Sequence, residues 1–298
     1  MLYIFRLLIP AIILMTCCTS ASERWFLEPL GAYEIKSDNP HLGGLSALHI
    51  KDFGKTFLML TDKGKYFETK IVRNNESKIT GLYIKKNGFL LNSSGQRLSR
   101  RNIDSESMAT KDGEGFFISF ESNNRVMFHE TITSKGKFLP KHDDFAKFDF
   151  NKGLEAIATN SDGELFAIPE KPPEGKIEFP IYKLLDNAWN VVGHFKPKNN
   201  FLVSDAFFLP NNDLLLLERA YDWKLGFKTQ LRVLQMDGNT IKNEYTILQL
   251  DSGKHNHEGI SIWQNNRGSD FLTLISDNNF IPFITSEIRE FKLFKRKN

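Results

Sequence analysis

The chain has 298 residues, of which 41% are hydrophobic and 25% are charged. This composition excludes a disordered chain, a collagen-like chain and a polytopic membrane protein. The net charge of +3 is small and spread along the sequence, which argues against a nucleic-acid-binding protein. Phe is abundant, with 26 residues, and an excess of aromatic side chains favours strands over helices.

Residues 1–21 have the features of an export signal. Arg6 supplies a positive charge, residues 7–14 form an apolar stretch, and small residues follow up to Ala21. The stretch is too short to anchor the chain across a bilayer, and a buried N-terminal helix is the alternative. We therefore expect an exported protein, in the periplasm or at the outer membrane, with its folded domain over residues 22–298.

Both cysteines of the chain, Cys17 and Cys18, follow the apolar stretch. This position resembles bacterial lipoprotein signals, in which a Cys becomes lipidated and anchors the protein to a membrane. Thr16 stands where a small residue such as Gly, Ala or Ser is usual, so cleavage near Ala21 without lipidation is the alternative. In either case residues 22–298 contain no Cys, which excludes disulfides, thiol catalysis and Cys-ligated zinc there.

A repeated pattern of short strands and turns fills the rest of the chain. Each repeat has a polar residue that opens a strand, a turn rich in Gly, Asp or Asn, and an apolar strand that ends in an acidic residue. The opening residues are spaced by 60, 49, 50 and 53 positions. They are Ser46, Glu106, Glu155, Asp205 and Glu258.

A period of about 50 residues with several short strands predicts the blades of a β-propeller. We expect one all-β domain of about five four-stranded blades, with six as the alternative, that exists as a monomer. The last repeat supplies only three strands. The segment RWFLEPLGAYEIK near the N-terminus is expected to close the propeller as the fourth, which removes an open sheet edge.

The motifs GGLSAL, DSESMA, FESNNRV, GLEAIA, LLLLERAY, TQLRV and NHEGISIW resemble the bacterial "esterase-like activity of phytase" family, also called phytase-like domain proteins. The resemblance extends from about Trp25 to Phe294. It implies an exported β-propeller and, from the family's name, the hydrolysis of esters or phosphoesters. Ser46 departs from the acidic pattern of the other repeats, so either the site is asymmetric at the first blade or that blade does not contribute to it.

The first strand of a propeller blade lines the central channel, so equivalent residues form a ring. We expect Glu106, Glu155, Asp205 and Glu258 to converge at one mouth and to hold a divalent cation, with calcium as the first choice because oxygen ligands suit it. Glu155 and Glu258 are also candidates for the general base. The alternative is structural, since such acids can also bond backbone N–H groups of neighbouring blades. A second acidic ring is expected where the second strands end, at Asp62, Glu121, Glu170, Glu218 and Asp277.

Other side chains are candidates for contacts with the substrate. Arg219 and Arg125 follow acidic strand ends and suit contact with phosphate or carboxylate. Tyr221, close to Arg219, would supply an aromatic wall. His257 precedes Glu258 and is a catalytic candidate as an acid or base. For each of them an ion pair or a solvated position is the alternative.

No serine-hydrolase elbow, zinc-protease motif or nucleotide-binding loop is present in the sequence. The leading hypothesis is a metal-assisted hydrolase of small-molecule phosphate or carboxylic esters at the channel mouth. The alternatives are a propeller of the cell envelope that binds a ligand or protein without catalysis, and a lactonase-like metalloenzyme.

Overall fold

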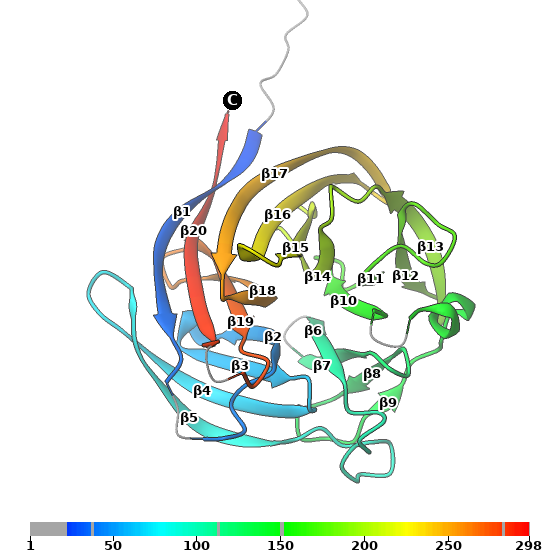
Figure 1. Cartoon of the computed structure of the whole chain (residues 1–298), viewed down its shortest axis with the longest axis horizontal. Coiled ribbons are helices and arrows are strands. Elements are labelled where there is room, and N and C mark those ends of the chain that lie inside the picture. Colours follow the sequence, from blue (N-terminus) through cyan, green and yellow to red (C-terminus); the bar gives the residue numbers. More distant parts are fainter. Residues whose placement is uncertain (1–22, 37–38, 112–113, 150–151, 282–283, 298) are drawn as a thin grey trace, which may run out of the picture.

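The computed structural model of the protein describes residues 23–36, 39–111, 114–149, 152–281 and 284–297. The predicted export signal, with Cys17 and Cys18, lies outside these residues. The described chain forms five antiparallel sheets of four strands each, arranged as blades around a central channel (Figure 1). The prediction of a five-bladed propeller is confirmed, and these sheets account for every named strand of the described part.

Four blades use consecutive strands, ordered from the channel outwards. Blade 1 consists of β2 (Leu45–Lys51), β3 (Thr56–Thr61), β4 (Lys65–Arg73) and β5 (Ile79–Phe89), and blade 2 of β6 (Ser105–Lys111), β7 (Glu114–Phe120), β8 (Arg125–His129) and β9 (Lys137–Phe138). Blade 3 consists of β10 (Leu154–Thr159), β11 (Leu165–Pro169), β12 (Phe179–Leu185) and β13 (Ala188–Phe195), and blade 4 of β14 (Leu202–Phe208), β15 (Leu214–Asp222), β16 (Gly226–Asp237) and β17 (Thr240–Gly253).

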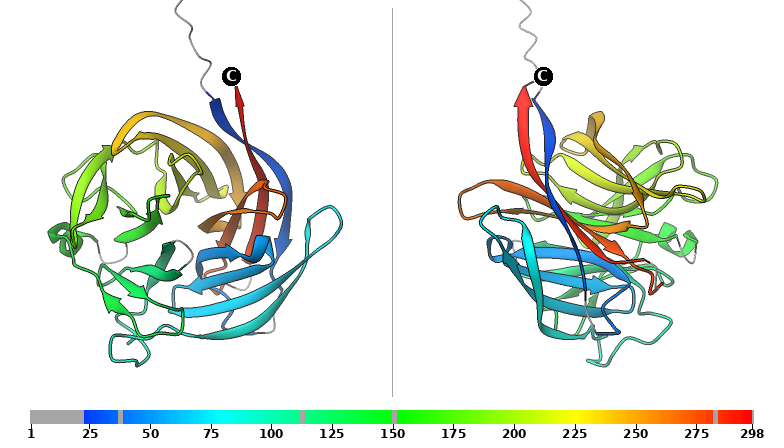
Figure 2. Two further views of the ribbon diagram at one scale, coloured as in Figure 1. Left: turned by 180° about the vertical axis from the view of Figure 1, so that it is seen from behind. Right: turned by 60° about the vertical axis from the view of Figure 1, so that its left-hand side comes forward.

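Blade 5 joins the two ends of the described chain. It consists of β18 (Asn256–Gln264), β19 (Asp270–Asp277), β20 (Glu287–Lys297) and, outermost, β1 (Glu23–Glu34). β1 pairs antiparallel with β20 from Glu23↔Lys297 to Glu34↔Glu287, and Figure 2 shows the two strands side by side from both directions. The prediction that an N-terminal strand closes the propeller is confirmed.

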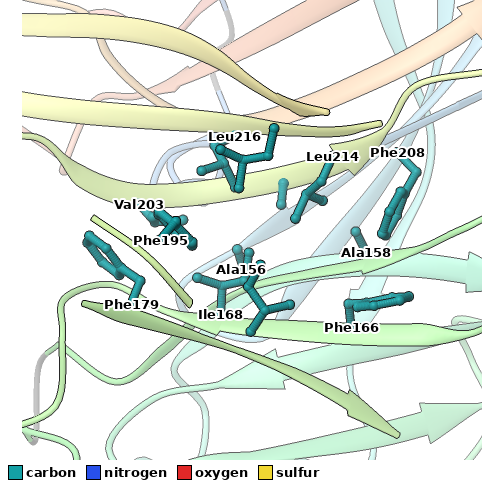
Figure 3. Close-up of a cluster of buried hydrophobic side chains, with 13 residues drawn as sticks. Ala156, Ala158, Phe166, Ile168, Phe179, Phe195, Val203, Phe208, Leu214 and Leu216 are labelled. Atoms are coloured by element: carbon teal, nitrogen blue, oxygen red, sulfur yellow. The ribbon is translucent and has the colours of Figure 1, made fainter. Parts of the chain in front are cut away.

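The core is divided into layers, one between each pair of neighbouring blades. In the layer between blades 3 and 4, Ile168 and Leu216 face each other and the rings of Phe166 and Phe208 lie 4.9 Å apart (Figure 3). Flat aromatic rings fill such layers with large apolar area, which explains the high Phe content. The layers hold the blades in fixed positions around the channel.

Helical structure is limited to the 3-10 turns Asp52–Gly54 and Asp143–Lys147 within the described ranges. Neither of these described turns is long and apolar enough to cross a bilayer.

Candidate functional site

The first strand of each blade breaks its pairing register near its start. A β-bulge of this kind redirects the extra residue away from the regular alternation. The sequence repeat aligns Asp205 with the ring residues of the other blades. The pairing register of β14 breaks between Val203 and Asp205, however, so Ser204 is the equivalent residue of blade 4. The skipped residues of the five blades are Ser46, Glu106 with Ser107, Glu155, Ser204 and Glu258.

The second strands end in another ring at the same mouth. The backbone N–H groups of Asp62, Glu121 and Glu170 donate to the residues just before β2, β6 and β10. Arg219 and Asp277 hold the corresponding places in blades 4 and 5, where they pair with Leu202 and Asn256. The second ring is therefore Asp62, Glu121, Glu170, Arg219 and Asp277.

The expectation that Glu218 belongs to this second ring is wrong by one position. Glu218 points into blade 4, where its carboxylate accepts hydrogen bonds from Arg232 and from Gln230 Nε2, the latter at 2.7 Å. The side chains of Glu218 and Arg232 are both fully buried. The alternation of a strand puts neighbours on opposite faces, so Arg219 takes the place at the channel mouth.

The carboxylates of the two rings, with Asp104 just before β6, form one electrostatically coupled group. We call this group the acidic mouth. Its members are Asp62, Asp104, Glu106, Glu121, Glu155, Glu170, Glu258 and Asp277.

Arg219 is the one cationic side chain that ion-pairs with the acidic mouth among the described residues. Its guanidinium lies 2.9 Å from the Glu258 carboxylate, 3.2 Å from Glu170 and 3.4 Å from Glu155. Burial alone would lower the pKa of Arg219, but these carboxylates raise it by more than burial lowers it, so Arg219 stays charged. The guanidinium thus bridges blades 3, 4 and 5.

No cationic side chain of the described ranges ion-pairs with the other half of the acidic mouth. Asp104, Glu106 and Glu121 of blade 2 each offer a carboxylate oxygen, and these oxygens all lie within 4.8 Å of one another. Asp62 lies beside them in blade 1, and one of its oxygens is buried without a hydrogen-bond partner. Hard divalent cations prefer clustered carboxylate oxygens, so the donors fit such an ion. The coarse prediction of an acidic cation site is supported, with Asp104 and Glu121 as members that the ring of first strands did not include.

Burial and mutual repulsion raise the pKa of several carboxyls in the acidic mouth. For Glu106 and Glu155 both causes act together and the pKa lies well above its usual value. Burial raises the pKa of Glu121 to about 7, although a backbone N–H of Gly153 opposes the shift. Burial likewise raises the pKa of Glu258 to about 7 against the effect of Arg219. A bound cation would favour the ionised forms of these groups.

The structural role expected as the alternative for the ring acids applies to some of them. Glu121 accepts a hydrogen bond from the backbone N–H of Gly153 in blade 3 at 2.5 Å. Ser46 donates to the Ser105 carbonyl of blade 2. Ser204 donates to the His257 carbonyl of blade 5. Glu106, Glu155 and Glu258 make their described side-chain contacts with other side chains of the mouth. Those three carboxylates are therefore available for chemistry.

Asp205 lies within the channel and joins three blades. Its Oδ1 accepts from Ser107 Oγ of blade 2 at 2.7 Å and from its neighbour's backbone N–H. Its Oδ2 accepts from the Ile260 N–H of blade 5 at 2.9 Å. Ala47, Ala156 and Gly259 hold the equivalent places of blades 1, 3 and 5, and Ser107 lies at the break of blade 2, so among the described first strands Asp205 is the one carboxylate at this level of the channel. This arrangement is that of a structural link rather than of a cation ligand.

The remaining candidates lie outside the acidic mouth. His257 is buried between blades 4 and 5, where Nδ1 lies 2.8 Å from Thr229 Oγ1 and Nε2 lies 3.6 Å from Glu287. The Arg125 guanidinium donates to the carbonyls of Asn102 and Asn123 and lies over the Phe120 ring.

Tyr221 shares the face of β15 that carries Arg219, two residues further along the strand. It is 62% exposed and packs against Phe227. It therefore stands at the rim of the mouth, on the hairpin between β15 and β16.

The fold and the sequence can be compared with known proteins. The structure aligns with an α-L-arabinofuranosidase from Podospora anserina, in complex with cellotriose, at a TM-score of 0.50 and 10% identity, covering 91% of this chain and 97% of that one. A PQQ-bound aldose sugar dehydrogenase from Streptomyces coelicolor aligns at a TM-score of 0.49 and 10% identity, covering 92% and 99%. No curated protein matches the sequence.

At such low identity the first of these likenesses concerns the fold alone. The sequence profile of the Phytase-like family, described as esterase-like activity of phytase, matches residues 40–280. That span begins before blade 1 and includes every residue of the acidic mouth and Arg219. The chain belongs to the Phytase-like family.

Proposed function

We propose that the protein is a cation-assisted hydrolase of phosphate or carboxylic esters that acts at the acidic mouth. The observation that carries this proposal is the convergence of Asp104, Glu106 and Glu121 within 4.8 Å, in the half of the mouth that Arg219 does not pair with. A divalent cation there would stabilise negative charge that develops on an ester or phosphoryl oxygen. Membership of the Phytase-like family supports the reaction class.

Glu258 is suited to move the proton of the reaction. Its pKa of about 7 matches the optimum for a general base at neutral pH. Its side chain is 13% exposed, so water can reach it. We propose that Glu258 accepts a proton from the attacking water, while Arg219, 2.9 Å away, holds the resulting carboxyl in place. Glu155, on the other side of Arg219, serves as the second positioning carboxylate.

The test pairs cation content with turnover. Purified protein is analysed for bound metal and screened with phosphomonoester, carboxylester and lactone substrates, with and without chelator. Turnover that the chelator abolishes is expected. Glu106→Gln should lose the cation and turnover together, whereas Glu258→Gln should keep the cation and lose turnover.

Glu174→Gln, an exposed change in a loop of blade 3, is the matched control and should behave as the wild type. Unchanged cation content and turnover in Glu106→Gln would overturn the proposal. Activity restricted to lactones would select the lactonase-like alternative.

A second candidate function, binding without catalysis, is favoured by exposed apolar side chains in loops on the face of the propeller that carries the mouth. Trp223 and Ile177, in loops that follow the second strands of blades 4 and 3, are 80% and 79% exposed. Exposed large apolar residues of this kind mark interaction surfaces. Absence of turnover on every ester class, with retained ligand binding, would select this function.

We also propose, on the N-terminal sequence, that the protein is exported as a monomer and lipid-anchored through Cys17 or Cys18. Mass spectrometry of the mature protein tests this, because a diacylglyceryl adduct on one of the two Cys is expected. A mature chain that begins near Ser22 would contradict the anchor.

A further inference from the structure

A cavity of about 820 Å³ opens beside the acidic mouth, between blades 1 and 2. Asp62 and Asp104 belong to both the cavity and the mouth. The other walls come from the segment before β2, from the end of β3, the start of β4 and the turn between them, from the end of β5 and the segment between β5 and β6, and from the loop after β19.

Four cationic side chains line this cavity, namely Lys63, Lys65, Arg97 and Arg100. Within the described part of the chain, no carboxylate lies within ion-pairing distance of any of them. Lys65 is only 7% exposed. Its ammonium opens onto the cavity without a counter-ion, and partial burial and the nearby Arg97 lower the pKa of Lys65. An anion in the cavity would relieve this.

Aromatic rings orient three of these cations. The Lys63 ammonium lies 3.2 Å from the centre of the Phe280 ring. The Arg97 guanidinium lies 3.3 Å from the centre of the Phe89 ring, and the Lys65 ammonium lies 5.3 Å from the same centre. Cation–π contacts hold a charge in place without neutralising it, so the cations keep their capacity for an anionic partner.

Apolar side chains complete the walls. Phe89, Leu98, Ile103 and Phe280 all face the cavity. A wholly polar polyanion would leave this surface without contacts. An aryl or short alkyl group would bury it favourably, at roughly 25 cal/mol for each Å² removed from water.

We propose that this cavity binds a substrate with an apolar body and a fixed anionic group, which Lys65 and Arg97 recognise. The anionic group is a phosphoryl group or a carboxylate. As a statement about substrate, this proposal rests on the proposed function, because it places the ester bond next to Asp104 at the acidic mouth. As a statement about binding, it stands on the cavity alone.

The binding test uses isothermal titration calorimetry with phenylphosphonate, benzoate, inorganic phosphate and benzyl alcohol. Phenylphosphonate or benzoate should bind, and the stronger of the two identifies the anionic group. Inorganic phosphate and benzyl alcohol, which lack the apolar body and the charge respectively, should bind at least tenfold more weakly. Benzyl alcohol that binds as tightly as both anions would overturn the proposal.

Variants assign the binding to the cavity. Lys65→Met and Arg97→Gln should each weaken binding of the aromatic anion about tenfold or more. Lys65→Met keeps a stem that can pack against Phe67 and Phe89. Arg97 is exposed, so its change leaves the fold intact. Arg267→Gln, an exposed cation between β18 and β19, is the control and should change nothing. Unaltered binding in both cavity variants would overturn the proposal.

Kinetics and a chelator separate this proposal from the hydrolase proposal. With Glu106→Gln in chelator, phenylphosphonate binding should persist. For an aryl ester with a remote anionic group, Arg97→Gln should raise KM about tenfold and leave kcat unchanged. For a neutral aryl acetate it should alter neither. Binding without any turnover would refute the hydrolase and retain the site, whereas a KM for the anionic ester that both cavity variants leave unchanged would refute the site alone.

Discussion

Arg219 and Glu258 come from different blades, yet their side chains meet at 2.9 Å at the channel mouth. The same guanidinium also reaches Glu155 and Glu170 of blade 3. One residue therefore supplies the fixed positive charge for half of the acidic mouth. The other half, with Asp104 and Glu106, depends on a mobile cation or on protons.

Replacing Arg219 by Met should destabilise the protein by about 2 to 4 kcal/mol at pH 8. Removing one partner of a buried ion pair leaves uncompensated charge and costs about 3–5 kcal/mol, and the Arg219 side chain is 23% exposed, which reduces this cost. At pH 5 the loss should be smaller because the carboxyls that it neutralises become protonated. Denaturant unfolding at both pH values measures the difference, with Arg267→Met as control. An equal loss at the two pH values would contradict this account.

Divalent cations should stabilise the protein more at pH 8 than at pH 5.5. The pKa of Asp62 and of Glu121 is raised to about 7 in the folded protein, chiefly by burial. It is about 4 in an unfolded chain. As pH rises from about 4 to about 7, only the unfolded state releases the proton, so folding stability falls by up to about 1.4 kcal/mol per pH unit for each group.

A cation binds the ionised carboxylates and reverses this loss. At a hundredfold excess over its dissociation constant it adds about 2.7 kcal/mol. Thermal melts with calcium, magnesium or chelator at the two pH values test the prediction. In Glu106→Gln the cation effect should vanish. A cation effect of the same size at both pH values would count against binding to these carboxylates.

Asp205→Asn should destabilise the propeller by about 1–3 kcal/mol. Its two carboxylate oxygens accept hydrogen bonds from Ser107, Ala206 and Ile260, and the new amide would direct N–H groups at one or more of these donors. Burial raises the pKa of Asp205 to about 7, so wild-type stability should fall between about pH 4 and pH 7 through this group. That contribution to the pH slope should be missing in the variant, as chemical denaturation across this range would show. Cation content should be unchanged, and its loss would reinstate Asp205 as a ligand.

Trp25→Ala should destabilise the protein by about 3–5 kcal/mol, the usual range for deletion of a buried Trp. Trp25 is 5% exposed, and it packs in the layer between blades 4 and 5. Its indole N–H donates to Asn211 Oδ1 at 3.1 Å, so β1 is attached to blade 4 as well as to β20. Phe138→Ala, at a ring that is 58% exposed, is the control. A small effect of Trp25→Ala would mean that β1 contributes little to closure.

The fold was predictable because its signals repeat. The period of about 50 residues, set by the five opening motifs, indicated the blades. Three strands after Glu258 indicated that an N-terminal segment completes the last blade, and β1 does so. The alternation of apolar and polar residues along a strand, as in the repeat from Asp205, is a local pattern of the sequence. It can therefore be recognised without knowledge of tertiary contacts.

The site was predictable only in part, because bulges shift the register by one residue. A bulge leaves no clear mark in a single sequence, and a search for repeated acids favours Asp205 over Ser204 and Glu218 over Arg219. Arg219 stands where the other blades carry an acidic residue, and this cation divides the mouth into two halves. The cavity beside Lys65 brings together segments from blades 1, 2 and 5, a proximity that no local pattern reveals.

The pairing of β1 with β20 sets an order of events during synthesis. The strand made first among the described residues must wait for the one made last, while all the intervening blades are produced. During that interval Trp25 has no neighbour in β20, and the apolar side of β1 is exposed. The ring therefore becomes complete only after β20 has been made, and until then the first blade and the last lack their shared boundary.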